Sequence, residues 1–221
     1  MTQVFGYHTP EGAVLATDSL ALHFDPQRDE PRRDVVRKVV HLSSHCVLIA
    51  AGAGHGLALA QAFAEYVRER GVRDTDAILD QAIAFCSAHW LKVRNRLAAI
   101  PPSREDLERF YLLFAGMTDR GGHPACRVLL LGCDEPGEPL APLPVGTAVA
   151  IPRHMGFEMR MARLSETERD LESVEKIMEG FLVRLAERSE DVAPPLTFLR
   201  IGPDGVRERT LDDTWFEPPS R

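Results

Sequence analysis

Residues 2–19 read TQVFGYHTPEGAVLATDS and contain two short runs rich in β-branched and aromatic residues. The turn signal TPEG separates the runs, so residues 2–8 and 12–19 are predicted to form a β-hairpin. Thr2 then stands at the start of the first strand. Removal of Met1 would give Thr2 both a hydroxyl nucleophile and a free α-amine, whose ordinary pKa of about 7.7–8.0 suits a general base near neutral pH.

The composition is that of one ordinary globular domain. The chain has 221 residues, of which 44% are hydrophobic and 27% charged, and neither a linker nor a repeat divides it. We therefore expect a single domain over residues 1–221, ending in a tail at about 212–221. The cysteines are scattered along the chain and are expected to be reduced core thiols: Cys46, Cys86, Cys126 and Cys133.

Charge and hydropathy argue against two classes of partner. The net charge of −7 and the pI near 5.6 provide no basic field for a phosphate backbone, so nucleic acid is not an expected partner. The chain contains no apolar run of membrane-spanning length and no signal peptide at its start. We therefore expect no membrane association and a cytoplasmic location.

Apolar patterning predicts further strands and helices after the hairpin. Helices are predicted where apolar residues recur at helical spacing: around the stripe Leu59–Val67, and over about 75–99 and 171–185. Strands are predicted at 37–42, 46–51, 110–116, 127–132, 196–201 and 206–211. The polar stretch 23–34 is predicted to be a surface loop. This order favours the α+β class, with antiparallel sheets and helices packed outside them.

Several short segments carry a family resemblance. They are Thr2, ATDS at 16–19, RKV at 37–39, AG at 51–52, and FAG at 114–116 followed by Asp119. Together these segments resemble a proteasome β-type subunit, of which the bacterial ATP-dependent HslV protease is a familiar version. The resemblance implies an N-terminal threonine hydrolase with a four-layer αββα sandwich, the Ntn-hydrolase fold. The segment between Asp18 and Lys38 is longer than in HslV, which favours a divergent bacterial proteasome homologue.

The resemblance places Asp18 and Lys38 beside Thr2. An ammonium near the Thr2 hydroxyl would stabilise a developing alkoxide and favour a neutral α-amine, while Asp18 would orient the ammonium. The chain has only three lysines, Lys38, Lys92 and Lys176, so a lysine at this position is informative. Taken alone, either residue could equally be a solvated strand residue or a turn former.

Three further positions match the family's site. Gly52 matches the glycine whose backbone N–H helps to form the oxyanion hole, although a helix-entry turn would also explain it. Ala50 falls at the base of the pocket for the substrate side chain, although core alanine is the commoner explanation. Ser19 is implied as a second substrate-binding residue.

Two segments depart from the family pattern. The family usually has Gly-Ser-Gly near the active threonine, whereas the best match here is Gly146-Thr147-Ala148; the Thr147 hydroxyl is expected to make the same hydrogen bond to the α-amine. The family also often has an aspartate followed three residues later by Ser-Gly, whereas Asp191 is followed by VAPP. We still expect Asp191 to accept a hydrogen bond at the site.

Other chemistries find no support in the sequence. It contains no Gly-x-Ser-x-Gly elbow, no His-Glu-x-x-His helix, no Cys-x-x-Cys pair and no dinucleotide-binding glycine fingerprint. Its histidines are dispersed. We therefore expect neither a metal nor a cofactor.

The resemblance also implies partners. It suggests homo-oligomeric rings that enclose the active sites and cleave polypeptide substrates, and an ATP-dependent unfoldase could feed such a chamber. Two alternatives stay open: a catalytically inactive proteasome-like shell or scaffold subunit, and an amidase that uses the same chemistry on small amides. Peptidase activity is the preferred interpretation.

Overall fold

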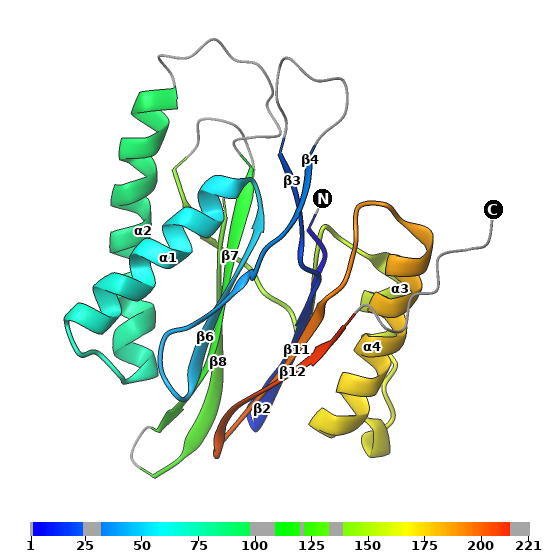
Figure 1. Ribbon diagram of the computed structural model, residues 1–221. Helices are drawn as coiled ribbons and strands as arrows, with labels where there is room; N and C mark the ends of the chain where they lie inside the picture. The colour runs from blue at the N-terminus through cyan, green and yellow to red at the C-terminus, as the bar shows by residue number, and fades with distance from the viewer. Residues whose placement is uncertain (1, 24–31, 98–108, 120–121, 133–138, 213–221) are drawn as a thin grey trace.

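The computed structural model describes residues 2–23, 32–97, 109–119, 122–132 and 139–212. Its elements follow the chain in this order (Figure 1): β1 (Val4–Thr9), β2 (Gly12–Thr17), β3 (Leu20–His23), β4 (Arg32–Val35), β5 (Val39–His41), β6 (Cys46–Gly52), α1 (Gly54–Glu69), α2 (Thr75–Leu97), β7 (Phe110–Asp119), β8 (Pro124–Gly132), β9 (Ala141–Leu143), β10 (Ala148–Ile151), α3 (Met155–Ala162), the short 3-10 helix η2 (Glu166–Glu168), α4 (Leu171–Arg188), β11 (Leu196–Gly202) and β12 (Gly205–Leu211).

The strands form two five-stranded sheets and one short ribbon. The β1 sheet has the order β10-β1-β2-β11-β12, the β7 sheet has the order β5-β6-β7-β8-β9, and β3 pairs only with β4. Every pairing between the described strands is antiparallel. The predicted first hairpin is confirmed as β1 and β2, and the α+β class with antiparallel sheets is confirmed with it.

Three buried clusters hold these elements together. One lies between the β7 sheet and helices α1 and α2, a second lies between the two sheets, and a third lies between the β1 sheet and helices α3 and α4. Figure 1 shows the two helix pairs on the outer sides of the two sheets. Strand alternation explains the division, because the neighbours Val47 and Leu48 on β6 point to opposite faces and belong to different clusters.

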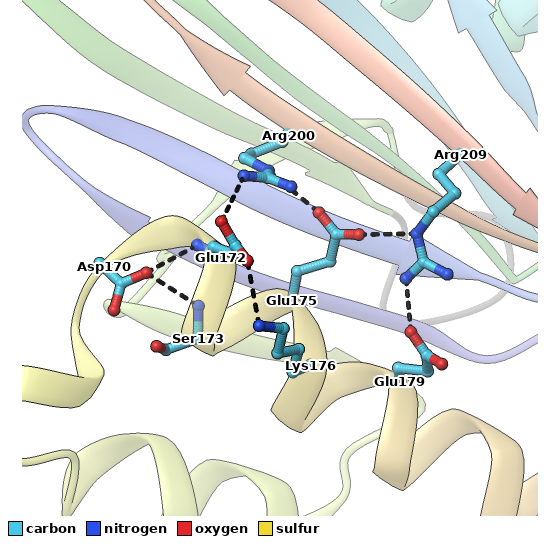
Figure 2. Close-up of polar contacts among 8 residues, drawn as sticks. All are labelled: Asp170, Glu172, Ser173, Glu175, Lys176, Glu179, Arg200 and Arg209. Atoms are coloured by element: carbon cyan, nitrogen blue, oxygen red, sulfur yellow. Dashed lines mark hydrogen bonds and ion pairs between the residues drawn. The ribbon is translucent and has the colours of Figure 1, made fainter.

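Helix α4 is held to the β1 sheet by ion pairs between side chains as well as by apolar contacts. Asp170 caps its first turn by accepting hydrogen bonds from the backbone N–H groups of Glu172 and Ser173. The buried Glu175 carboxylate accepts from Arg200 on β11 at 3.1 Å and from Arg209 on β12 at 2.9 Å (Figure 2). This network fixes the helix across the last two strands of the sheet.

The structure contains elements that were not predicted from the sequence. The stretch 23–34 was predicted to be a loop, but Arg32–Val35 forms β4 and pairs with β3, while residues 24–31 lie outside the described part. Strand β4 is mostly exposed, so no apolar alternation indicates it. Helix α3, with strands β9 and β10, was not predicted; it has eight residues and buries only Phe157 and Met161, too few to show a helical period.

The structure also bears on the expected reduced cysteines, the C-terminal tail and the apolarity of the helices. Cys46, Cys86 and Cys126 are free thiols, and burial raises the pKa of each to about 12; Cys133 and the tail from residue 213 lie outside the described residues. None of the described helices combines the length and apolarity needed to cross a membrane.

Candidate active site

A buried ion pair joins the two sheets beside the start of β1. Lys38 Nζ lies 2.9 Å from Asp18 Oδ1, and the two side chains are 4% and 0% exposed. Asp18 directly follows β2 in the β1 sheet, whereas Lys38 directly precedes β5 in the β7 sheet. Two of the residues expected around Thr2 are therefore brought into direct contact.

The same carboxylate binds the backbone next to Thr2. The N–H of Gln3 donates to Asp18 Oδ1 at 2.9 Å, and the N–H of Leu20 donates to Asp18 Oδ2 at 2.9 Å. Asp18 Oδ1 thus accepts hydrogen bonds from both the Lys38 ammonium and the residue that follows Thr2. Because Thr2 is itself buried, the arrangement places it one residue from a charged pair inside the protein.

Burial and the ion pair act in opposite directions on Lys38. Desolvation lowers the pKa of the Lys38 ammonium below its ordinary value, and the negative charge of Asp18 partly opposes this effect. A lowered pKa makes this lysine easier to deprotonate than one in water. The negative charge of Asp18 therefore helps to keep Lys38 protonated.

The register of β1 and β2, continued by two residues, places Ser19 opposite Thr2. The polar groups of Ser19 already form hydrogen bonds with other segments. Its N–H donates to Ala193 O at 3.1 Å, its hydroxyl donates to Pro195 O at 2.6 Å, and its carbonyl accepts from Val36 N at 2.8 Å. These bonds explain Ser19 as a structural link between three segments. The structure brings it close to Thr2, but its expected contact with substrate stays a prediction.

Gly52 ends β6 in a conformation that favours glycine. Its φ is +89°, and a Cβ at this position would lie 2.5 Å from the carbonyl oxygen of Arg109. The next residue, Ala53, donates its N–H to the same oxygen at 2.9 Å. Backbone packing alone therefore requires glycine here, and the oxyanion role remains a prediction.

Ala50 is placed in the helix-side core. It is 4% exposed and belongs to the cluster between α1, α2 and the β7 sheet. Its N–H donates to the carbonyl of Lys38 at 3.1 Å, so Ala50 lies directly beside the lysine on the neighbouring strand. Core packing is sufficient to explain the alanine, and the predicted pocket role stays a prediction.

Thr147 lies beside the end of β1 that is far from Thr2. Strand β10 pairs antiparallel with β1, with Val4 opposite Ile151, and the carbonyl of Thr147 accepts from His8 N at 2.9 Å. His8 is six residues from Thr2, which is about 20 Å along an extended strand. The expected hydrogen bond from Thr147 to the amine of Thr2 is therefore not part of this site, because the short sequence match carried no information on strand register.

Asp191 lies in a segment that approaches the site, but its own side chain is exposed. Two residues further on, Ala193 accepts the hydrogen bond from Ser19. The neighbouring Glu190 forms an ion pair with Arg33 of β4 at 2.8 Å. The structure thus places the segment beside Ser19, whereas the hydrogen bond that Asp191 is expected to accept at the site stays a prediction.

Sequence reasoning missed the residues on the β10 side of Thr2. The Gln3 side chain donates to Pro152 O at 3.2 Å, and Arg153 follows directly in the segment between β10 and α3. The Arg153 guanidinium forms an ion pair with Glu158 of α3 at 2.7 Å. The apolar strand TAVAI before Pro152 was the available signal for this contact, since a strand there pairs with β1.

An open depression lies elsewhere, away from Thr2 and Gly52. It has a volume of about 420 Å³ and is lined by His45, Thr75 and Asp119, among others. His45 precedes the start of β6, whereas Gly52 ends that strand, so the depression lies at the opposite end of the sheet from Gly52. No group of three or more His, Cys, Asp or Glu side chains able to hold a metal ion occurs in the described part of the chain.

The comparisons with known proteins rest on structure alone. No family model and no curated protein matches the sequence. A solved structure of Anbu from Hyphomicrobium sp. strain MC1, described as a Gly-1 mutant, matches with a TM-score of 0.63 and covers 97% of this chain and 88% of its own. The chain has a proteasome-like fold. At 16% sequence identity, the similarity shows the fold and does not single out HslV.

Proposed function

We propose that the protein is an N-terminal threonine peptidase with the αββα arrangement of Ntn hydrolases. The observation that carries the proposal is the buried Asp18–Lys38 pair, whose carboxylate oxygen also binds the N–H of Gln3. The proteasome-like fold supports hydrolase chemistry as a class. Thr2 is the residue that this arrangement serves.

Stability alone gives a weak reason for such a pair. Removing two charges from water costs several kcal/mol for each ion, and well-packed apolar residues often replace a buried pair without loss of stability. A buried pair beside a hydroxyl at the start of a strand instead provides a fixed electrostatic field for chemistry. The burial of Asp18 and Lys38 thus supports a functional role.

The proposed reaction has two stages. The Thr2 hydroxyl oxygen attacks the peptide carbonyl carbon, and the free α-amine of Thr2 accepts the hydroxyl proton and passes it to the departing amine. Lys38, held by Asp18, stabilises negative charge on the attacking oxygen, and the N–H of Gly52 stabilises the oxyanion. The same amine then takes a proton from water, whose oxygen attacks the acyl carbon; the ester bond to the Thr2 oxygen breaks, the amine returns the proton to that oxygen, and the acid product is released.

Assembly and substrate size form a further part of the proposal. Large apolar side chains are exposed on helices of both outer sides, Ile83 and Leu91 on α2 and Met155 and Met159 on α3. Exposed apolar residues of this kind are consistent with contacts between copies of the chain. We propose homo-oligomeric rings that degrade polypeptides, with an ATP-dependent unfoldase as a possible feeder.

The test combines the intact mass of the chain with the rate of peptide hydrolysis. Intact-mass measurement should show a chain beginning at Thr2, and fluorogenic peptides should be hydrolysed by the wild type and by Thr2→Ser but not by Thr2→Ala. Undiminished hydrolysis by Thr2→Ala would refute the proposal. Hydrolysis of small amides in preference to peptides would indicate an amidase, and a processed but inert protein would indicate a shell subunit.

A further inference from the structure

We propose that Gln3 is a positioning residue, whose side-chain amide fixes Thr2 for attack. This inference rests on the proposed function. The Gln3 side chain is buried, with the residue only 6% exposed, and its Nε2 donates to Pro152 O at 3.2 Å and, more weakly, to Val4 O at 3.4 Å. Its position between Thr2 and β1 lets it act on the nucleophile through the backbone.

Gln3 is held from both neighbouring strands. On the β2 side, its N–H donates to Asp18 Oδ1 at 2.9 Å and its carbonyl accepts from Asp18 N at 3.4 Å. On the β10 side, the amide side chain reaches the carbonyl of Pro152, which lies between β10 and α3. The ladder between β1 and β10 begins one residue later, with Val4 opposite Ile151, and among the described residues the side-chain bond is the contact that Gln3 itself makes on the β10 side. A substitution can remove this bond without touching the bonds to Asp18.

The position of Thr2 makes such a clamp useful. Thr2 precedes the first residue of β1, and chain ends are poorly ordered unless something ties them down. Misplacing a reacting group by 1 Å can reduce the rate by roughly 10²-fold. A clamp at the adjacent residue therefore has a direct effect on turnover.

Gln3→Leu and Gln3→Glu test the role in different ways. Gln3→Leu removes the donor, and we expect kcat to fall roughly 10- to 100-fold while KM stays within about threefold, because the loss is one of alignment. In Gln3→Glu, a carboxylate would face two carbonyl oxygens, and only the protonated acid can donate to Pro152 O. The activity of Gln3→Glu relative to the wild type should therefore rise as the pH falls.

A matched control separates positioning from general damage. Gln61 is exposed on α1, and Gln61→Leu and Gln61→Glu should match the wild type at every pH. Thermal unfolding of each variant checks that it is folded at the assay temperature. The ratio of Gln3→Glu activity to wild-type activity across pH does not require Gln3→Leu, so it stays informative if Gln3→Leu fails to fold.

The outcomes are distinct for the two proposals. If wild-type activity depends on Thr2 but Gln3→Leu keeps kcat within twofold, or if the Gln3→Glu ratio is flat with pH, the positioning role is wrong. A change confined to the unfolding temperature would also overturn it. If instead Thr2→Ala retains full activity, the proposed function fails, whatever the Gln3 variants show.

Discussion

Two ionic clusters in this protein differ in how their charges are shared. The Asp18–Lys38 pair joins the two sheets, its side chains are at most 4% exposed, and Lys38 is the only cation that Asp18 contacts in the described structure. The Glu175 network instead joins α4 to β11 and β12, and its two arginine side chains, Arg200 and Arg209, are 32% and 44% exposed. The first cluster is buried and has a single cation. The second is partly exposed to water and has two.

Under the proposed function, this difference separates a pair that acts on Thr2 from a network that only holds the fold together. In the Glu175 network, Arg200 also contacts Glu172 and Arg209 also contacts Glu179 (Figure 2), so each cation keeps a partner when one acid is lost. Within the described part of the chain Asp18 has no second cation of this kind, and its other partners here are the backbone N–H of Gln3, next to Thr2, and that of Leu20, the first residue of β3. Changes at the first cluster should therefore affect activity and stability, whereas changes at the second should affect stability only.

Lys38→Met should give the largest effect. It leaves the Asp18 carboxylate buried without its cation, which costs about 3–5 kcal/mol of unfolding free energy, and it removes the charge that we propose stabilises the Thr2 alkoxide. We expect peptide hydrolysis to fall to background, measured beside denaturant unfolding. The double variant Asp18→Asn/Lys38→Met should recover part of the stability but none of the activity; recovered activity would contradict the functional role.

Glu175→Gln should weaken the clamp without affecting chemistry. It removes the negative charge between two arginines while keeping the shape of the side chain, and we expect a loss of about 1–3 kcal/mol, as for other charged hydrogen bonds. Denaturant unfolding measures this loss, and kcat below the unfolding transition should match the wild type. A tenfold fall in kcat in the folded protein would show that the two clusters are coupled.

The pH dependence of Lys38 sharpens the comparison. Since burial lowers its pKa in the folded protein, the unfolded chain keeps the lysine proton to higher pH, and the contribution of Lys38 to stability should rise as the pH passes upward through the folded pKa. Activity should fall over the same range, below the ordinary lysine pKa of about 10.4. Lys38→Arg should remove this alkaline limb; an unchanged limb would assign it to another group.

Lys176→Met should give the smallest effect and serves as a lysine control. Lys176 forms an exposed i,i+4 pair with Glu172 at 3.0 Å, with side chains 73% and 59% exposed. Solvent screening leaves such exposed pairs with little effect on stability. Unfolding and hydrolysis should both stay near wild-type values, and a large loss would show that any lysine removal damages the protein.

The parts of the fold with strong local signals could be predicted from sequence. The TPEG turn and the Pro203-Asp204-Gly205 turn mark the two hairpins of the β1 sheet, and Gly205 has a φ of +107°. The apolar stripe of α4 repeats over 18 residues. Helix α3 is too short for such a repeat, and β4 is too exposed, so neither could be predicted.

The site could be predicted where the family resemblance was supported by distinctive residue chemistry. The resemblance placed Asp18 and Lys38 together, the rarity of lysine in the chain made that match informative, and the structure shows the contact. Thr147 failed because a hydroxyl between small residues is common and its strand register was unknown. Gln3 was missed because a glutamine acquires meaning only through a partner 149 residues away.

The central claim is that Thr2 is an N-terminal nucleophile served by Lys38 and Asp18. The most direct measurement treats the purified protein with a peptide vinyl sulfone and locates the adduct by mass spectrometry of the intact chain and its fragments. We predict one adduct per chain, on Thr2 of a chain that begins at Thr2, and no adduct in Thr2→Ala or Lys38→Met. A chain that keeps Met1 and remains unlabelled, or an adduct that persists in Thr2→Ala, would contradict the claim.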